Sequence, residues 1–221
     1  FPVLSIYMRI HIPNSAWLGN IDPFLQGFEP SKPNQLELTF NKKWMSIHPM
    51  VLSMIAALGL GIKSSKITCE KLEATSKHYL ERMNLFDFLK MDSGINITEH
   101  DSSGRFIPLT QIKNSASLTK FVTDVTPLLH LEAKHAEPIR YIMSELIRNV
   151  IEHSMSKDGA IVSAQYYKKS NTIRIGIADT GIGIWKSINE SHNPKTDLDA
   201  IRMALTPGIT GATRKEGGTE R

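Results

Sequence analysis

The spacing of hydrophobic positions predicts alternating strands and helices along most of the chain. Residues 1–34 carry five prolines and predict a loop-rich lead-in, although the alternation of Val3–Ile12 predicts one strand there. From residue 35 the pattern predicts two strands that alternate with two helices, and Pro49 suits the first turn of the first helix. These elements are the strands Leu36–Phe40 and Lys66–Leu72 and the helices Met50–Leu60 and Thr75–Phe88.

A polar segment, Asp92–Gly104, separates this first part from a second run of elements. The second run opens with a helix over Ser117–Leu131 that Pro127 interrupts. After Gly183 the pattern becomes polar, with a short helical patch at Leu198–Leu205. Between these segments lie a helix that starts at Pro138 and ends near Ser154, and the strands Ala160–Lys168 and Thr172–Asp179 around a tight turn.

This order of elements predicts an α/β protein with two units. The loop-rich lead-in over 1–34 is followed by a small α/β module over 35–110 and by a second α/β domain over 111–221. In the second domain, Ile173, Ile175 and Ile177 alternate with polar or small residues, so we expect one face of that strand to be buried.

Composition excludes two broad classes of protein. Only 14 of the 221 residues are Gly and 11 are Pro, and 41% are hydrophobic, so the chain is not of the disordered kind. The longest apolar stretch, Met50–Ile62, is shorter than the ~20 residues that a bilayer crossing requires, so no membrane span is expected. The single cysteine, Cys69, cannot form an internal disulfide, and the expected compartment is the reducing cytoplasm.

The helix predicted from Pro138 carries polar side chains beside its apolar stripe. Glu145, Asn149 and Glu152 lie within about 60° of one another around the helix axis. A carboxylate and an amide oxygen on one surface suit water or Mg²⁺ beside a phosphate, although Glu and Asn four residues apart are also common on a solvated helix edge. The expected stripe consists of Ile139, Met143, Leu146 and Val150.

The second of the two later strands delivers Asp179 directly into a glycine-containing segment, Asp179–Gly183. Gly181 and Gly183 allow the backbone to turn sharply and a ligand to approach closely. A carboxylate held there can accept a hydrogen bond from an amine of a base. An ordinary strand-to-loop turn would use the same residue types, so this segment alone is weak evidence.

Taken in order, these segments resemble the GHKL superfamily of ATP-binding domains, which includes gyrase, heat-shock chaperones, histidine kinases and mismatch-repair ATPases. The run from Glu145 to Ser154 looks like the superfamily's N box, and Asp179–Gly183 looks like its first glycine box, with two strands between them. The resemblance covers roughly Leu118 to the end and is greatest to the histidine-kinase-like and anti-sigma-factor-like modules. It implies a two-layer α/β sandwich with helices on one face of a mixed sheet.

The resemblance also implies roles for individual residues. Asn149 would coordinate a Mg²⁺ ion that bridges the phosphates of ATP, and Glu145 would orient or deprotonate the attacking water or hydroxyl. Asp179 would accept from the adenine amino group, while Gly181 and Gly183 let the loop pass under the base. His153 occupies a position where related modules also have a histidine. Residues 185–218 would form the ATP lid, within which Arg214 and Lys215 are candidate γ-phosphate contacts, with a solvated basic pair as the alternative.

Two departures from the superfamily stand out. The chain ends at Gly217–Arg221, before the second glycine box and the last strands that members normally have, so we expect the domain to be truncated at its C-terminus. His130 and His135 lie too close to the N box to be phospho-accepting residues. The strand–helix–strand–helix order of residues 35–110 resembles the STAS-like anti-sigma antagonist domains that partner such kinases, although no motif supports it.

The expected function is therefore Mg²⁺-dependent ATP binding with hydrolysis or phosphoryl transfer to a protein. One alternative is a nucleotide-gated interaction module that engages a protein partner without useful turnover. Another is a nucleic-acid-binding protein, because the net charge of +4 permits attraction to polyanions; the lack of aromatic and basic clusters places this third. A homodimer is left open.

Overall fold

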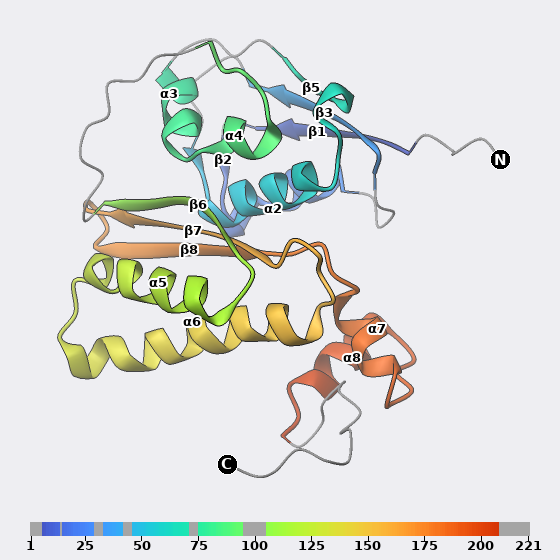
Figure 1. Ribbon diagram of the computed structural model, residues 1–221, viewed down its shortest axis with the longest axis vertical. Helices are drawn as coiled ribbons and strands as arrows, with labels where there is room; N and C mark the ends of the chain where they lie inside the picture. The colour runs from blue at the N-terminus through green and yellow to red at the C-terminus, as the bar shows by residue number, and fades with distance from the viewer. Residues whose placement is uncertain are drawn as a thin grey trace.

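The chain folds as an α/β protein whose layers follow one another in Figure 1 from top to bottom. The computed structural model describes residues 6–13, 15–28, 33–41, 46–70, 75–94 and 105–207. The layers are a parallel sheet, a buried helix, an antiparallel sheet and a pair of helices (Figure 1). Each layer is formed by a different part of the sequence, and the antiparallel sheet with its pair of helices carries the candidate site.

The first layer is a parallel sheet in the order β1–β3–β5, formed by Tyr7–Ile12, Gln35–Phe40 and Ile67–Cys69. The strict alternation of β1 buries every second side chain, as its sequence predicts. A second, two-stranded parallel sheet pairs β2 with β4. The remaining elements of this part are β2 (Ser15–Ala16), β4 (Ser46–Ile47), α1 (Asp22–Leu25), α2 (Pro49–Leu60), α3 (Thr75–Arg82), α4 (Leu85–Leu89) and the 3₁₀ turns Leu18–Asn20 and Ser64–Lys66.

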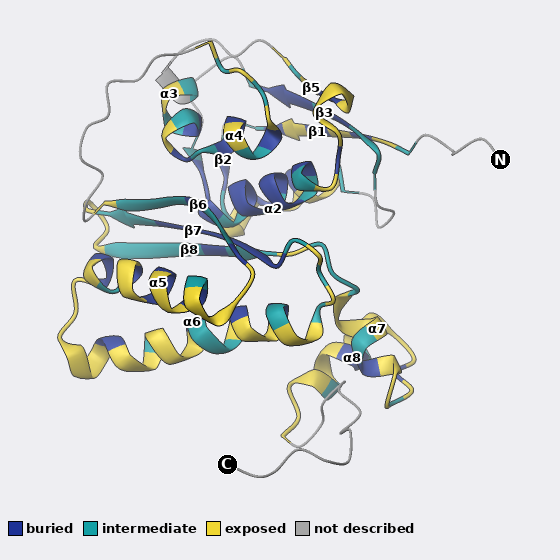
Figure 2. Cartoon of the chain, in the orientation of Figure 1, coloured by how far each residue is buried: buried dark blue, intermediate teal, exposed yellow. Residues whose placement is uncertain are grey.

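Helix α2 lies between the two larger sheets, is largely buried (Figure 2) and is apolar around most of its circumference. A helix that is hydrophobic on all sides is stable only where it is covered on all sides. The predicted bounds of α2 are confirmed, with Pro49 at its first position. The core around it also includes Leu109 and Ile161 from the antiparallel sheet. The first module and the antiparallel sheet therefore share one hydrophobic core.

The antiparallel sheet has the order β6–β7–β8 (Phe106–Ile112, Ala160–Tyr167 and Thr172–Ala178). Helices α5 (Ser115–Val125) and α6 (Ala133–His153) cover the face opposite α2 (Figure 1), and the 3₁₀ turn Thr126–Leu129 joins them. Beyond the sheet, α7 (Gly183–Asn189) and α8 (Asp197–Ala204) pack on each other near the end of α6.

Several expectations need correction. Strand β6 was missed because Pro108 interrupts the strand pattern, and the register shifts between Ile107 and Thr110. The predicted boundary at residue 110 falls inside this strand. Among the described strands the sheet is antiparallel throughout, not mixed, and its second face is covered by α2 rather than open.

Three helices also differ from expectation. The helix predicted over Thr75–Phe88 is divided at Asn84, which adopts the left-handed conformation. Helix α6 begins at Ala133, so Pro138 lies inside it rather than at its start. Helix α7 was not predicted, because its seven residues are too few for the helical spacing of Ile184 and Ile188 to stand out from the polar sequence around it. Within the described segments, no helix has the length and apolar character that a membrane crossing needs.

His48 caps the N-terminus of α2. Its Nδ1 accepts a hydrogen bond from the backbone N–H of Met50 (3.1 Å), and its buried ring stands edge-on to Trp17. Burial, and to a smaller extent the positive charge of Arg174, lower the pKa of His48 below its usual value. The folded protein therefore favours the neutral ring.

We expect this cap to make the stability of the protein pH-dependent. The unfolded chain takes up a proton on His48 near pH 6.5, whereas the folded chain does so only at lower pH. The free energy of unfolding should thus fall as pH drops below about 6.5. His48→Asn keeps a capping oxygen but cannot titrate, so it should lose less stability between pH 7.5 and 5.5 in urea unfolding. Equal losses in both proteins would contradict the prediction.

Candidate functional site

The end of helix α6 and the loop that follows β8 meet in the structure. The backbone N–H of Ile182 donates a hydrogen bond to the carbonyl oxygen of Ser154, the C-cap residue that follows α6 (2.8 Å). The two motifs are separated by two strands in the sequence, yet this bond joins them directly. His153, Asp179, Gly181 and Gly183, which the sequence predicted as one site, therefore gather at one end of α6.

The two glycines of this loop are required for different reasons. A Cβ atom on Gly181 would collide with the carbonyl oxygen of Ser154 and would lie 2.6 Å from the Cβ atom of Ser154. Gly183 has space around it but adopts a φ of +79°, which residues with side chains avoid. The first glycine therefore permits a close backbone contact, and the second permits the turn into α7.

Asp179 stabilises the loop through its own side chain. Its Oδ1 accepts a hydrogen bond from the backbone N–H of Gly181 (2.7 Å), a local turn that aspartate commonly forms. The residue is exposed at the end of the sheet, immediately after β8. Within the parts of the chain that the structure describes, no hydrogen bond engages Oδ2. One carboxylate oxygen is thus committed to the loop, and the other is available to a ligand.

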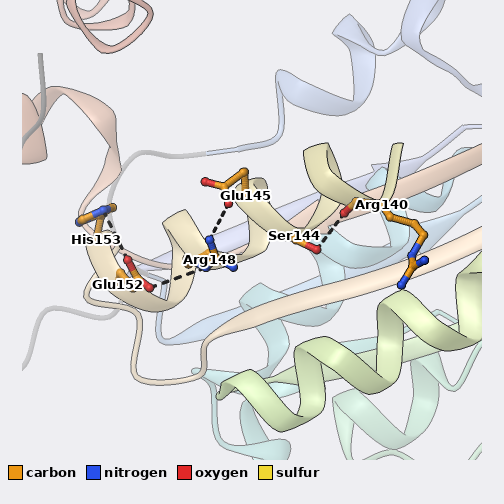
Figure 3. Close-up of polar contacts among 6 residues, drawn as sticks. All are labelled: Arg140, Ser144, Glu145, Arg148, Glu152 and His153. Carbon is orange, nitrogen blue, oxygen red and sulfur yellow. Dashed lines mark hydrogen bonds and ion pairs between the residues drawn. The ribbon is translucent and has the colours of Figure 1, made fainter. Parts of the chain in front are cut away.

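Four charged or titratable side chains form a row along α6 (Figure 3). Arg148 Nη1 lies 2.6 Å from Glu145 Oε1, and Arg148 Nε lies 3.9 Å from Glu152 Oε1. His153 Nε2 is 4.0 Å from Glu152 Oε2. Arg148 and Glu145 are 48% and 37% exposed, so their ion pair is worth about 0–1 kcal/mol and opens easily. The ion pair between Arg148 and Glu145 was not predicted from the sequence.

Asn149 lies one helical turn after Glu145 and one turn before His153. It is exposed, and in the described part of the chain its side-chain amide has no hydrogen-bond partner. An unengaged amide oxygen is a hard donor of the kind that Mg²⁺ accepts. Asn149 therefore offers an oxygen donor on α6, five residues before Ser154, which contacts the glycine loop.

A metal ion can be held by protein ligands alone, or by a few protein oxygens together with ligands from outside the chain. The described ranges contain no cluster of three or more His, Cys, Asp or Glu side chains that could bind a metal ion by themselves. Mg²⁺, however, is commonly held by one or two protein oxygens together with phosphates and water. Asn149 can supply one such oxygen.

One part of the expected lid can be described. Helices α7 and α8 belong to this part and lie near the C-terminal end of α6 (Figure 1). Ile184, Trp185, Leu198, Ile201 and Leu205 expose apolar side chains there. Arg214 and Lys215, the predicted γ-phosphate contacts, lie outside the described residues.

The predicted apolar stripe of α6 is wrong at one position. Leu146 is 50% exposed, and the buried positions of the helix are Ala136, Met143, Ile147 and Val150. The buried face is therefore rotated toward Ile147 relative to the prediction. As a result, Glu145 and Asn149 lie well away from the core, on the solvent side of the helix.

The chain was compared with known protein families, curated proteins and solved structures. No protein-family model, curated protein or solved structure matches the chain. The geometry of α6 and the glycine loop is therefore the basis for assigning a function.

Proposed function

We propose that this protein binds ATP with Mg²⁺ in a GHKL-type domain built from the β6–β8 sheet and helices α5 and α6. One observation carries the proposal: the Asp179 loop is hydrogen-bonded to the carbonyl of Ser154, the C-cap of the helix that bears Glu145 and Asn149. An acceptor for a base, an oxygen donor for a metal and a carboxylate for proton transfer then follow one another along a single helix and its adjoining loop.

At the base-binding end, Asp179 accepts a hydrogen bond from the exocyclic amine of adenine through its free oxygen. The loop hydrogen bond to Gly181 holds the carboxylate in place before the ligand arrives. Gly181 and Gly183 keep side chains away from the plane of the base. This arrangement favours a base with an amino group over one with a carbonyl at the same position, because a carbonyl would face the carboxylate oxygen.

At the phosphate end, Asn149 contributes an oxygen ligand to Mg²⁺. An ion held there would supply neutralisation of the phosphate charge. Glu145 orients or deprotonates the attacking water or hydroxyl. Its ion pair with Arg148 must open first, and the anionic phosphates compete for Arg148.

A second candidate follows from that same ion pair. While Arg148 engages Glu145, the nearby positive charge makes the carboxylate a weaker base, and bound ATP would turn over more slowly. The protein would then be a nucleotide-gated module that engages a protein partner, in the cytoplasm that its single cysteine favours. The two candidates share the nucleotide site and differ only in phosphate release.

Calorimetric titration of Mg·ATP into the wild type and Asp179→Asn tests the proposal. In the variant, Oδ1 still accepts from Gly181, but an amide NH₂ replaces the oxygen that would accept from adenine. We expect affinity to fall about 10- to 100-fold, the loss typical of a charged hydrogen bond. Asp124→Asn, which removes an exposed carboxylate on α5, is the matched control and should bind normally.

The outcome against the proposal is equally clear. No heat and no thermal stabilisation of the wild type at millimolar Mg·ATP would refute it. If binding occurs, heat flow that persists after mixing indicates turnover, and Glu145→Gln should stop that flow while leaving affinity intact. Saturable binding without persistent heat flow would favour the interaction module.

A further inference from the structure

Strand β8, which leads into the Asp179 loop, contacts different parts of the protein on its two faces. Ile173, Ile175 and Ile177 pack into the core formed with α5 and α6. The alternate residues include Gly176, which meets α2, and Ala178, which packs into the core of the N-terminal module. The strand is therefore held from behind by residues that are more than 100 positions away in the sequence.

The first contact behind β8 is made by the first turn of α2. A Cβ atom on Gly176 would lie 2.5 Å from Pro49 C, Pro49 O and Met50 N, so the helix backbone rests directly on the strand backbone. Ser163 lies opposite Gly176 in the β7–β8 register. Its Oγ donates to Pro49 O (3.1 Å) and lies 3.1 Å from Ser53 Oγ, and both serines are fully buried. Hydrogen bonds thus fix α2 where it touches the sheet.

The second contact involves Arg174, two residues before Gly176. Its guanidinium carbon lies 4.0 Å from the centre of the Trp17 ring and 5.2 Å from that of Tyr167. Trp17 and Tyr167 meet edge to face at 5.5 Å. Trp17 belongs to the segment between β2 and α1, so this stack joins the N-terminal segment to β8.

A hydrogen-bonded group continues this contact along β7. Gln165, which pairs with Arg174 in the sheet, accepts hydrogen bonds through Oε1 from the hydroxyls of Tyr79 (2.9 Å) and Tyr167 (2.7 Å). Tyr79 comes from α3 of the N-terminal module. Helices α2 and α3 and the Trp17 segment therefore all meet the same half of the β7–β8 pair.

We infer that the N-terminal module positions the Asp179 loop through β8, with Trp17, Arg174 and Gly176 as positioning residues. On one side the loop is hydrogen-bonded to the Ser154 carbonyl. On the other side it continues from β8, in which Arg174 contacts Trp17 and Gly176 contacts the first turn of α2. A shift of the N-terminal module moves Arg174 and Gly176, and with them Asp179 three residues later. The consequence for ATP affinity rests on the proposed function, whereas the mechanical coupling does not.

Hydrogen exchange of Trp17→Ala, followed by mass spectrometry without any ligand, tests the coupling. Loss of the ring beneath Arg174 should speed exchange in peptides spanning 174–183 about fivefold, the factor expected for one cation–π contact. Peptides from 115–125 and 143–150, on the opposite face, should be unchanged. Leu18→Ala, which truncates the exposed neighbour of Trp17, is the matched control and should exchange like the wild type.

Two results would overturn the inference. One is unchanged exchange over 174–183, and the other is an equal rise across α5 and α6, which indicates general loss of stability. If Trp17→Ala fails to fold, Arg174→Lys replaces it, since lysine keeps the charge but lacks the planar group that stacks on Trp17.

The nucleotide measurement is made separately on the same variants. If the wild type binds Mg·ATP, Trp17→Ala should weaken binding about fivefold while the turnover of bound ATP stays the same. If the wild type binds no ATP, the proposed function fails, but the exchange result still decides whether the module positions the loop. Hydrogen exchange therefore tests the mechanical coupling, and calorimetry tests ATP binding.

Discussion

Gly181→Ala is expected to reduce Mg·ATP affinity by at least about 100-fold, the scale on which misplacement of binding groups by an ångström acts. The added methyl group would collide with the backbone oxygen of Ser154 and would lie 2.6 Å from the Ser154 Cβ atom. A backbone carbonyl at the end of a helix cannot rotate away as a flexible side chain can. The loop must therefore leave α6, and the hydrogen bond from Ile182 to Ser154 is lost with it.

The measurement is again a calorimetric titration, with circular dichroism to establish that the sheet and helices persist. Gly183→Ala is the matched control, because it adds the same methyl group where nothing lies within 4 Å. Its cost is the strain of a positive φ, about 1–2 kcal/mol, without a collision. We expect this control to retain more of the affinity than Gly181→Ala. Wild-type binding by Gly181→Ala would show that the ligand-bound loop does not rest on Ser154.

Gly176→Ala is expected to have the largest effect on stability, lowering the free energy of unfolding by about 3 kcal/mol, at the upper end for overpacked cores. The methyl group would be placed 2.5 Å from three backbone atoms of Pro49 and Met50. Relief requires α2 to move off the sheet, which would stretch the hydrogen bond from Ser163 to Pro49. The cost therefore combines steric overlap with the weakening of a buried polar contact.

Urea unfolding measures this effect as a lower midpoint at an unchanged slope. Gly19→Ala serves as the matched control, since no atom lies within 4 Å of the added group, and its stability should change by less than about 0.5 kcal/mol. A loss of less than about 1 kcal/mol in Gly176→Ala would mean that α2 adjusts to the strand without leaving it.

Local chemistry made part of the fold predictable. Pro49 before an apolar run defined α2, the alternation of Ile173, Ile175 and Ile177 defined β8, and Pro127 marked the end of α5. Strand β6 was not predictable in the same way, because Pro108 sits within a register shift that only the partner strand β7 reveals. Local patterns report what a segment prefers, whereas a bulge depends on the strand beside it.

The candidate site was likewise predictable in its side chains but not in its backbone contacts. A common site for Glu145, Asn149 and Asp179 was proposed because the order of their segments resembles that of the GHKL motifs. The role of Ser154 was not visible, since it is the backbone carbonyl that accepts from Ile182. The clash that makes Gly176 necessary was hidden as well, because glycine in a strand signals a close approach without naming the partner.

The position of α2 between two sheets constrains how this protein can diverge over evolution. Each residue on the helix is selected by the surface that it meets, and α2 meets the parallel sheet on one side and β7 and β8 on the other. A lineage that lost the N-terminal module would expose the back of the antiparallel sheet, including buried Ile161 and Ser163. Such a lineage would have to acquire polar residues on β7 or a new covering element. Inheritance of the two parts is thereby linked.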